Sequence, residues 1–159
     1  MTAPLLHHLP RYCSSPRPLA TTLALLLTVP ACHQTPAVRE LLITGVDYAF
    51  QVPDTIAPGP ITLGFRNAGV VPHEVAIALL KPGVTLGQVL ELAAAGGDVD
   101  SLFDGTVGIL IANPGDTAAG RLLVDLQPSR TYALGCNFRD GPDQPPHLAL
   151  GMVASLRVK

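Results

Sequence analysis

The sequence predicts an all-β fold, a Greek-key antiparallel β-sandwich with one short inserted helix. Apolar side chains recur at every second position through several short segments, which is the period of strands with one buried face. Turns rich in proline, glycine and asparagine separate these segments. One segment, residues 85–95, has the wider apolar spacing of a helix instead.

The alternating segments define the expected strands and their buried faces. Their opposite faces carry polar residues such as Glu74, Ser155 and Arg157. The expected inward faces are Ile61, Leu63 and Phe65; Val71, His73, Val75, Ile77 and Leu79; Leu122, Val124 and Leu126; Tyr132, Leu134 and Cys136; Met152, Ala154, Leu156 and Val158.

The helical segment carries its own start and stop signals. Thr85 is a suitable N-cap, and Gly96 is suited to end the helix. Its apolar side chains form one stripe, made of Leu86, Val89, Leu90 and Ala93. We therefore expect one helix between two strands.

Length and composition exclude several classes of protein. The 159 residues fit one domain. With 10 Lys+Arg against 12 Asp+Glu, no basic surface is available to neutralise many phosphates, which argues against nucleic-acid binding. No apolar stretch reaches the roughly 20 residues that a membrane-spanning helix needs.

The first part of the chain is typical of an export signal. Arg11 and Arg17 precede an apolar run over residues 19–29, and a small residue, Ala31, follows. We expect residues 1–31 to be this signal. An ordinary cleaved signal and an uncleaved anchor are the alternatives.

Cys32 follows the apolar run in the sequence Val-Pro-Ala-Cys, which resembles a bacterial lipobox. The resemblance implies that Cys32 is lipidated and anchors an extracytoplasmic protein, periplasmic or at the cell surface, to the membrane. Residues 32–40 are then a tether, and residues 41–159 form the domain. Cys136 would be left as a lone thiol in an oxidising compartment, which favours burial or a bound partner.

Four residues could hold one copper ion. Cys136, His147 and Met152 lie close together near the C-terminus, and His73 lies upstream on an expected strand. Two imidazoles, a thiolate and a weak axial thioether are the ligands of a blue-copper centre. Zinc rarely takes a methionine ligand, so Met152 favours copper.

The segment from about residue 41 to 159 resembles the cupredoxins. The matching pieces are Asn67-Ala-Gly-Val-Val-Pro-His73-Glu, Tyr132-Ala-Leu-Gly-Cys136 and Pro146-His147-Leu-Ala-Leu-Gly-Met152-Val, followed by the strand 154–158. The resemblance implies one type 1 copper ion with His73, Cys136 and His147 equatorial and Met152 axial. It implies one-electron transfer outside the cytoplasm, with a partner protein such as a cytochrome or an oxidase. Apolar neighbours are expected to exclude water and raise the potential.

Two features depart from the family pattern. Residues 137–146, which include three prolines, separate Cys136 from His147, whereas familiar members have only a few residues there. Many members follow the first histidine with Asn or Ser, which helps to secure the thiolate, but this chain has Glu74. The long segment between Cys136 and His147 bears on the geometry of the copper site. Glu74 bears on the groups that surround the ligands.

Simpler interpretations remain for each residue taken alone. His73, Cys136 and Met152 suit an apolar core, and His147 suits an exposed loop. The acidic residues Asp140 and Asp143 could be solvated or could steer a cationic partner. The alternative functions are a copper carrier or buffer with the same ligands and no redox circuit, and a non-metal β-sandwich binding module. An enzyme is not expected, because no candidate nucleophile has a complete set of partners.

Overall fold

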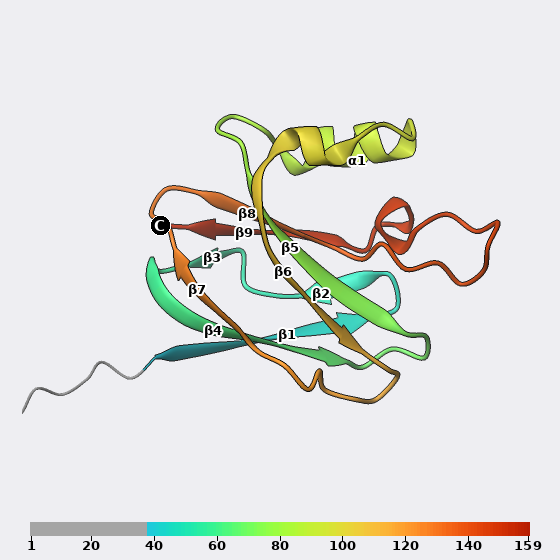
Figure 1. Cartoon of the computed structure of the whole chain (residues 1–159), viewed down its shortest axis with the longest axis horizontal. Coiled ribbons are helices and arrows are strands. Elements are labelled where there is room, and N and C mark those ends of the chain that lie inside the picture. Colours follow the sequence, from blue (N-terminus) through green and yellow to red (C-terminus); the bar gives the residue numbers. More distant parts are fainter. Residues whose placement is uncertain (1–37) are drawn as a thin grey trace, which may run out of the picture. The chain divides into compact units, whose positions relative to one another are not determined.

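The computed structural model describes residues 38–159 (Figure 1). The expected export signal and Cys32 lie outside these residues. Strand β1 begins at Arg39, so it includes two residues that the sequence pattern assigned to a tether. The strands are β1 Arg39–Val46, β2 Ala49–Gln51, β3 Thr55–Ile56, β4 Gly59–Asn67, β5 His73–Leu80, β6 Phe103–Ala112, β7 Leu122–Leu126, β8 Thr131–Gly135 and β9 Val153–Val158. The helices are α1 Leu86–Ala94 and the 3₁₀ helices η1 Val99–Leu102 and η2 His147–Leu150.

The described strands form two sheets that pack as a sandwich. One sheet has the order β2-β1-β4-β7, and the other has the order β3-β9-β8-β5-β6. The β1–β4 and β3–β9 pairs are parallel, so the sheets are mixed, and the other pairs are antiparallel. The predicted β-sandwich with one inserted α-helix is confirmed.

The core lies between the two sheets, and the predicted alternation supplies it. Ile61, Leu63 and Phe65 on β4 are at most 1 % exposed, and they face Val75 and Ile77 of β5 across the sandwich. Burial of this apolar area is the main force that holds the sheets together. Strand β6, which the sequence pattern did not reveal, completes the five-stranded sheet beside β5.

Helix α1 lies on the outer face of the five-stranded sheet (Figure 1). Thr85 caps its first turn in a reciprocal capping box with Gln88. Ala95 is the C-cap, and Gly96 follows at φ +68°, a conformation that glycine adopts without strain. Val89 is the residue that α1 buries most deeply, and the predicted helix boundaries are confirmed.

The ends of several elements meet at one end of the sandwich, at the right of Figure 1. They are the turn between β1 and β2, the start of β5, and the long segment between β8 and β9 that contains η2. This arrangement brings residues that are distant in sequence to one place.

Candidate metal centre

Three potential metal-binding atoms converge at this end of the sandwich. His73 opens β5, Cys136 follows β8 directly, and His147 opens η2. The Nδ1 atoms of the two histidines are 3.1 Å apart, and Cys136 Sγ lies 3.9 Å from the Nδ1 of His73 and 3.5 Å from that of His147. All three residues are at most 1 % exposed. The structure thus brings together three of the four predicted ligands within one compact cluster.

Met152, the fourth predicted ligand, is 0 % exposed and lies directly before β9. Its N–H donates to the carbonyl of His147 at 2.9 Å, and its carbonyl accepts from the N–H of Cys136 at 3.2 Å. Gly45 leaves room for its side chain, because a Cβ there would lie 3.2 Å from Met152 Cε. Met152 is therefore held beside the cluster by its own backbone.

Backbone hydrogen bonds also fix the positions of Cys136 and His147 relative to each other. Leu148 donates its N–H to the carbonyl of Cys136 at 2.7 Å, and His147 donates to the carbonyl of Phe138 at 2.8 Å. The segment 137–146 thus leaves the sheet after Cys136 and returns next to it. Its length does not separate the ligands in space.

Asn67, at the end of β4, organises the loop that leads to His73. Its side-chain amide donates to the carbonyls of Val71 and Ala112, and its Oδ1 accepts from the N–H of Gly69. Asn67 is 0 % exposed. Because these bonds connect β4, the loop and β6, they fix the position at which β5 begins.

Each histidine ring is held from its other nitrogen by a carboxylate. His73 Nε2 lies 3.0 Å from Asp47 Oδ1, and His147 Nε2 lies 3.0 Å from Asp140 Oδ1. The hydrogen bond with His73 holds the pKa of Asp47 below its ordinary value. The pKa of Asp140 is lowered mainly by a hydrogen bond from Tyr48 and further by His147. Both carboxylates are therefore ionised at neutral pH.

These contacts determine where the imidazole protons are. An ionised carboxylate only accepts hydrogen bonds, so the Nε2 atoms of His73 and His147 carry the donated protons. In a neutral imidazole the Nδ1 atom is then a bare lone pair. Two such lone pairs face each other at 3.1 Å, next to a sulfur atom. A cation between the three atoms would satisfy all of them.

The spacing of the three atoms fits one metal ion. The point equidistant from both Nδ1 atoms and Sγ lies about 2 Å from each, close to the ~2.0–2.1 Å and ~2.3 Å bonds that imidazole nitrogen and thiolate form with zinc, another first-row metal. Burial raises the pKa of the Cys136 thiol, so an ion that binds there has to displace the thiol proton. The donor set of two imidazoles and one thiolate suits copper.

Glu74 follows His73 and is 7 % exposed, although the sequence pattern placed it on the outward face. Its backbone N–H points at Cys136 Sγ, at 3.5 Å. Its Oε1 accepts from the backbone N–H of Asn137 at 3.1 Å and from the Asn137 side chain at 3.0 Å. Glu74 therefore connects the strand of the first histidine to the residue after the cysteine.

The turn between β1 and β2 supplies two residues that sequence reasoning missed. Asp47 contacts His73, and the Tyr48 hydroxyl donates to Asp140 Oδ2 at 2.5 Å, while the Tyr48 ring packs edge-on against His147. Tyr48 has φ +63°, which is rare for an aromatic residue and marks a constrained turn. Asp-Tyr is not a characteristic turn sequence, so only the fold shows this role.

Gly69 makes the Asp47 contact possible. A Cβ at this position would lie 2.2 Å from Asp47 Oδ1 and 3.0 Å from His73 Nε2. Any side chain there would force the two groups apart.

The structure shows two features of the C-terminal loop that the simplest interpretations did not include. His147, whose simplest interpretation was an exposed loop residue, is 1 % exposed because η2 turns it inward. Asp140, weighed as a solvated or steering charge, is about one-third exposed and also holds His147. Neither contact is visible in the sequence, because both depend on the folding of residues 137–146.

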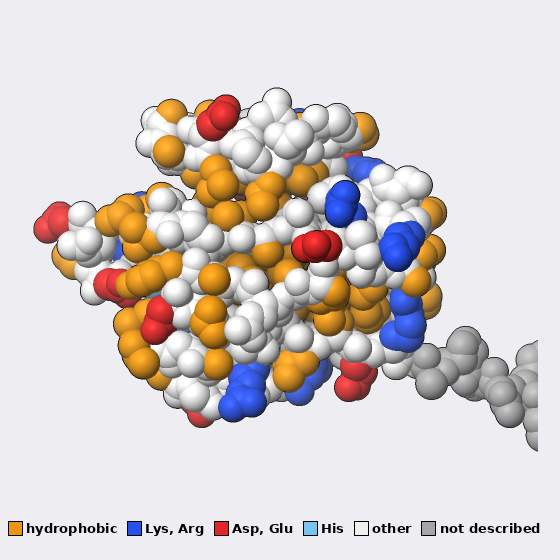
Figure 2. Space-filling model, turned by 180° about the vertical axis from the view of Figure 1, so that it is seen from behind, with side chains coloured by type: hydrophobic (Ala, Val, Ile, Leu, Met, Phe, Trp, Pro, Cys, Tyr) orange, Lys and Arg blue, Asp and Glu red, His pale blue; other side chains and the backbone are white. Residues whose placement is uncertain are grey.

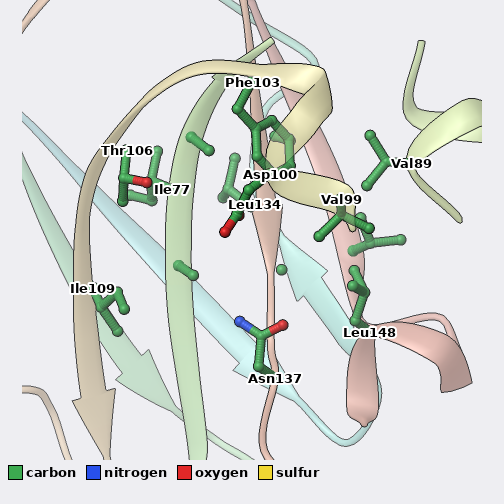
Figure 3. A pocket seen from close by; sticks show the side chains of 15 residues that line it. Ile77, Val89, Val99, Asp100, Phe103, Thr106, Ile109, Leu134, Asn137 and Leu148 are labelled. Atoms are coloured by element: carbon green, nitrogen blue, oxygen red, sulfur yellow. The ribbon is translucent and has the colours of Figure 1, made fainter. Parts of the chain in front are cut away.

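A cavity of about 280 Å³ lies on the outer face of the five-stranded sheet, beneath α1 and η1 (Figure 3). Alanines and a glycine of β5 and β8 line it on one side. Val89, Val99 and Phe103 line it from the helices and the start of β6. Asn137 and Leu148, the neighbours of Cys136 and His147, line its edge. The cavity is therefore adjacent to the segment between β8 and β9 that carries Cys136 and His147.

Comparison with solved structures identifies the fold. The dithionite-reduced auracyanin of Roseiflexus castenholzii shares 22 % identity at a TM-score of 0.51, with 77 % of this chain and 98 % of that protein covered. Auracyanin B shares 20 % identity at a TM-score of 0.50, with 79 % of this chain and 91 % of that protein covered. Both are cupredoxins, and the chain has the cupredoxin fold. No protein-family model and no curated protein sequence matches the chain.

Proposed function

We propose that this protein binds one copper ion in a type 1 site and transfers single electrons. His73, Cys136 and His147 would hold the ion through Nδ1, Sγ and Nδ1, and Met152 would provide a weak axial contact. Copper would supply the one-electron couple. The protein would exclude water from the site and hold the donor atoms in one geometry for both oxidation states.

The facing Nδ1 atoms are the observation that carries this proposal. They are 3.1 Å apart, and each imidazole gives its Nε2–H to a carboxylate. The arrangement of carboxylate, histidine and metal is common in metal sites, where it fixes the tautomer and orients the ring. A packing role would not require two buried lone pairs to converge on a thiol.

Burial of the ligands favours electron transfer over copper carriage. A carrier needs a ligand that a partner can reach to exchange the ion, and an exposed His147 would have provided one. His73, Cys136, His147 and Met152 are all at most 1 % exposed. An enclosed site would retain its ion, because only an electron, and not the ion itself, would have to pass to the partner protein.

We propose that the surface beside the site binds a cationic partner protein, such as a cytochrome or an oxidase. Asp47 and Asp140 are about one-third exposed next to the histidines, and Val70 and Leu150 expose apolar surface nearby. Figure 2 shows acidic and apolar side chains at this end, on the left, while most visible Lys and Arg side chains lie elsewhere. Opposite charges would guide such a partner to the ligand end of the sandwich.

We also propose that the protein works outside the cytoplasm, anchored by a lipid on Cys32. The support is the sequence pattern of residues 1–32. Within residues 38–159, no helix is long and apolar enough to cross a membrane. Mass spectrometry of the purified native protein should find a diacylated or triacylated N-terminal cysteine. An unmodified Cys32, or one that is absent from the mature chain, would refute the anchor.

A visible absorption spectrum during Cu(II) titration tests the function. We expect an intense thiolate-to-copper band that saturates at one equivalent and bleaches upon one-electron reduction. Binding without this band, and stronger for Cu(I), would favour the carrier. If neither oxidation state binds, the four residues are packing residues, and the protein is a non-metal module.

A further inference from the structure

Both histidines of the proposed site have a carboxylate directly behind them. Asp47 and Asp140 each accept a hydrogen bond from an Nε2 atom at 3.0 Å. A carboxylate in this position draws the imidazole proton toward itself and makes the metal-facing Nδ1 a stronger donor. Stronger donation favours the more highly charged state of a bound ion.

The third strong donor has a carboxylate beside it as well. The backbone N–H of Glu74 points toward Cys136 Sγ. The Glu74 carboxylate accepts two hydrogen bonds, from the backbone and the side chain of Asn137, the residue that follows Cys136. Glu74 is 7 % exposed, so solvent screens its charge less than it screens the charges of Asp47 and Asp140.

Lys and Arg side chains do not neutralise these three groups. Among residues 38–159, Asp47 and Asp140 contact the Nε2–H groups of the two histidines, and no Lys or Arg side chain forms an ion pair with Asp47, Asp140 or Glu74. Arg139, which is nearby in sequence, donates to the carbonyl of Gln144 instead. Three carboxylates that no Lys or Arg side chain neutralises therefore lie next to the three donor residues.

Resting on the proposed function, we propose that Asp47, Asp140 and Glu74 set the redox preference of this site toward Cu(II). Loss of one electron raises the charge of the site by one unit, and each nearby carboxylate stabilises that additional positive charge. The three carboxylates therefore lower the midpoint potential. This is the opposite of the effect expected from apolar neighbours alone.

Three nearly isosteric substitutions test this inference in the full chain: Glu74→Gln, Asp47→Asn and Asp140→Asn. Each one replaces a charged carboxylate with a neutral amide, whose oxygen still accepts a hydrogen bond. Asp125→Asn is the matched control, since Asp125 is an exposed carboxylate on β7 in the other sheet. The measurements are the midpoint potential by redox titration of the visible band, and the Cu(II) and Cu(I) affinities. Far-UV circular dichroism identifies the variants that fold.

We expect all three substitutions to raise the potential. For Glu74→Gln we expect about a tenfold loss of preference for Cu(II) over Cu(I), which is about 59 mV for a one-electron couple. The shifts for Asp47→Asn and Asp140→Asn should be smaller, because those groups are one-third exposed. Asp125→Asn should leave the potential unchanged.

The failure of this inference differs from the failure of the proposed function. If the wild-type protein shows the blue-copper band but the folded variants keep or lower its potential, the carboxylates do not set the redox preference. A shift for Asp125→Asn as large as that for Glu74→Gln would also overturn the inference, because net charge alone would explain it. A wild-type protein that binds no copper would refute the proposed function instead.

Discussion

At the scale of the residue, the site depends on which atom of each side chain faces inward. The carboxylates of Asp47 and Asp140 hold the imidazole protons on the Nε2 atoms of His73 and His147. The Nδ1 atoms of both histidines are then available as donors to a metal ion. Cys136 completes the set because the Glu74 N–H and the surrounding β-strands hold its sulfur in place. His73, His147 and Cys136 are thus each positioned by a neighbour that is not itself a candidate ligand.

Substitutions of the two sulfur residues should differ sharply in effect. Cys136→Ser removes the thiolate, so we expect loss of the visible band and of most Cu(II) affinity. Met152→Leu removes only the axial thioether and conserves volume, so it should retain the band and cost less than about 1.5 kcal/mol of stability. Parallel Cu(II) titrations and urea unfolding check both. Equal behaviour of the two variants in the titration would contradict the assigned roles.

Gly69→Ala tests the contact between Asp47 and His73 without touching either residue. The added Cβ would lie 2.2 Å from Asp47 Oδ1, so the carboxylate must move away from the ring. We expect Cu(II) affinity to fall by about 10–100-fold, the usual cost of losing a partner of a metal-binding histidine. Competition titration against a chelator measures it. Gly105→Ala, at a position with open space, is the control, and equal affinities in the two variants would refute the contact's importance.

At the scale of the element, the site is built where strands end. β4, β5, β8 and β9 supply a rigid frame, and the turn between β1 and β2 covers the histidines from outside. The segment 137–146 is an irregular stretch, but its ends are fixed by backbone hydrogen bonds next to Cys136 and His147. Rigid strands and a pinned loop together keep the donor atoms in one arrangement.

Asn67→Ala should show how strongly the β4–β5 loop is held. The substitution leaves the carbonyls of Val71 and Ala112 and the N–H of Gly69 without their side-chain partner. Buried groups left unpaired cost about 1–3 kcal/mol each, so we expect a loss of about 2–4 kcal/mol after partial relaxation of the loop. Urea unfolding provides the number. Asn113→Ala, on an exposed turn, should stay within about 0.5 kcal/mol, and a similar loss in both variants would disprove this role of Asn67.

At the scale of the whole molecule, the sequence predicted the sandwich because alternation is strong where one face of a strand is buried. Ile61, Leu63 and Phe65 are an example: all three lie in the core. Strand β6 escaped prediction because Ile109 and Ile111 are about half exposed, so its pattern lacks a polar face. The parallel pairing of β1 with β4 also could not be predicted, because alternation shows which face of a strand is buried and not which strand lies beside it.

The candidate ligands could be proposed from residue types and their order, but the groups that hold them could not. Asp47 and Tyr48 lie in a turn without a characteristic sequence, and they reach the histidines only after the sheets have formed. Asp140 could be noticed as an acidic loop residue, but its contact with His147 depends on the path of the loop. Contacts of this kind are set by tertiary structure rather than by local pattern.

A crystal structure of the copper-loaded protein, with anomalous scattering measured at the copper edge, would locate the ion relative to the three donor atoms. We expect one strong anomalous peak, about 2.0–2.3 Å from the Nδ1 atoms of His73 and His147 and from Cys136 Sγ. Both Nε2 atoms should still face Asp47 and Asp140. A peak at the Nε2 atoms, a peak away from Cys136, or no ordered peak at this end of the sandwich would contradict the proposed site.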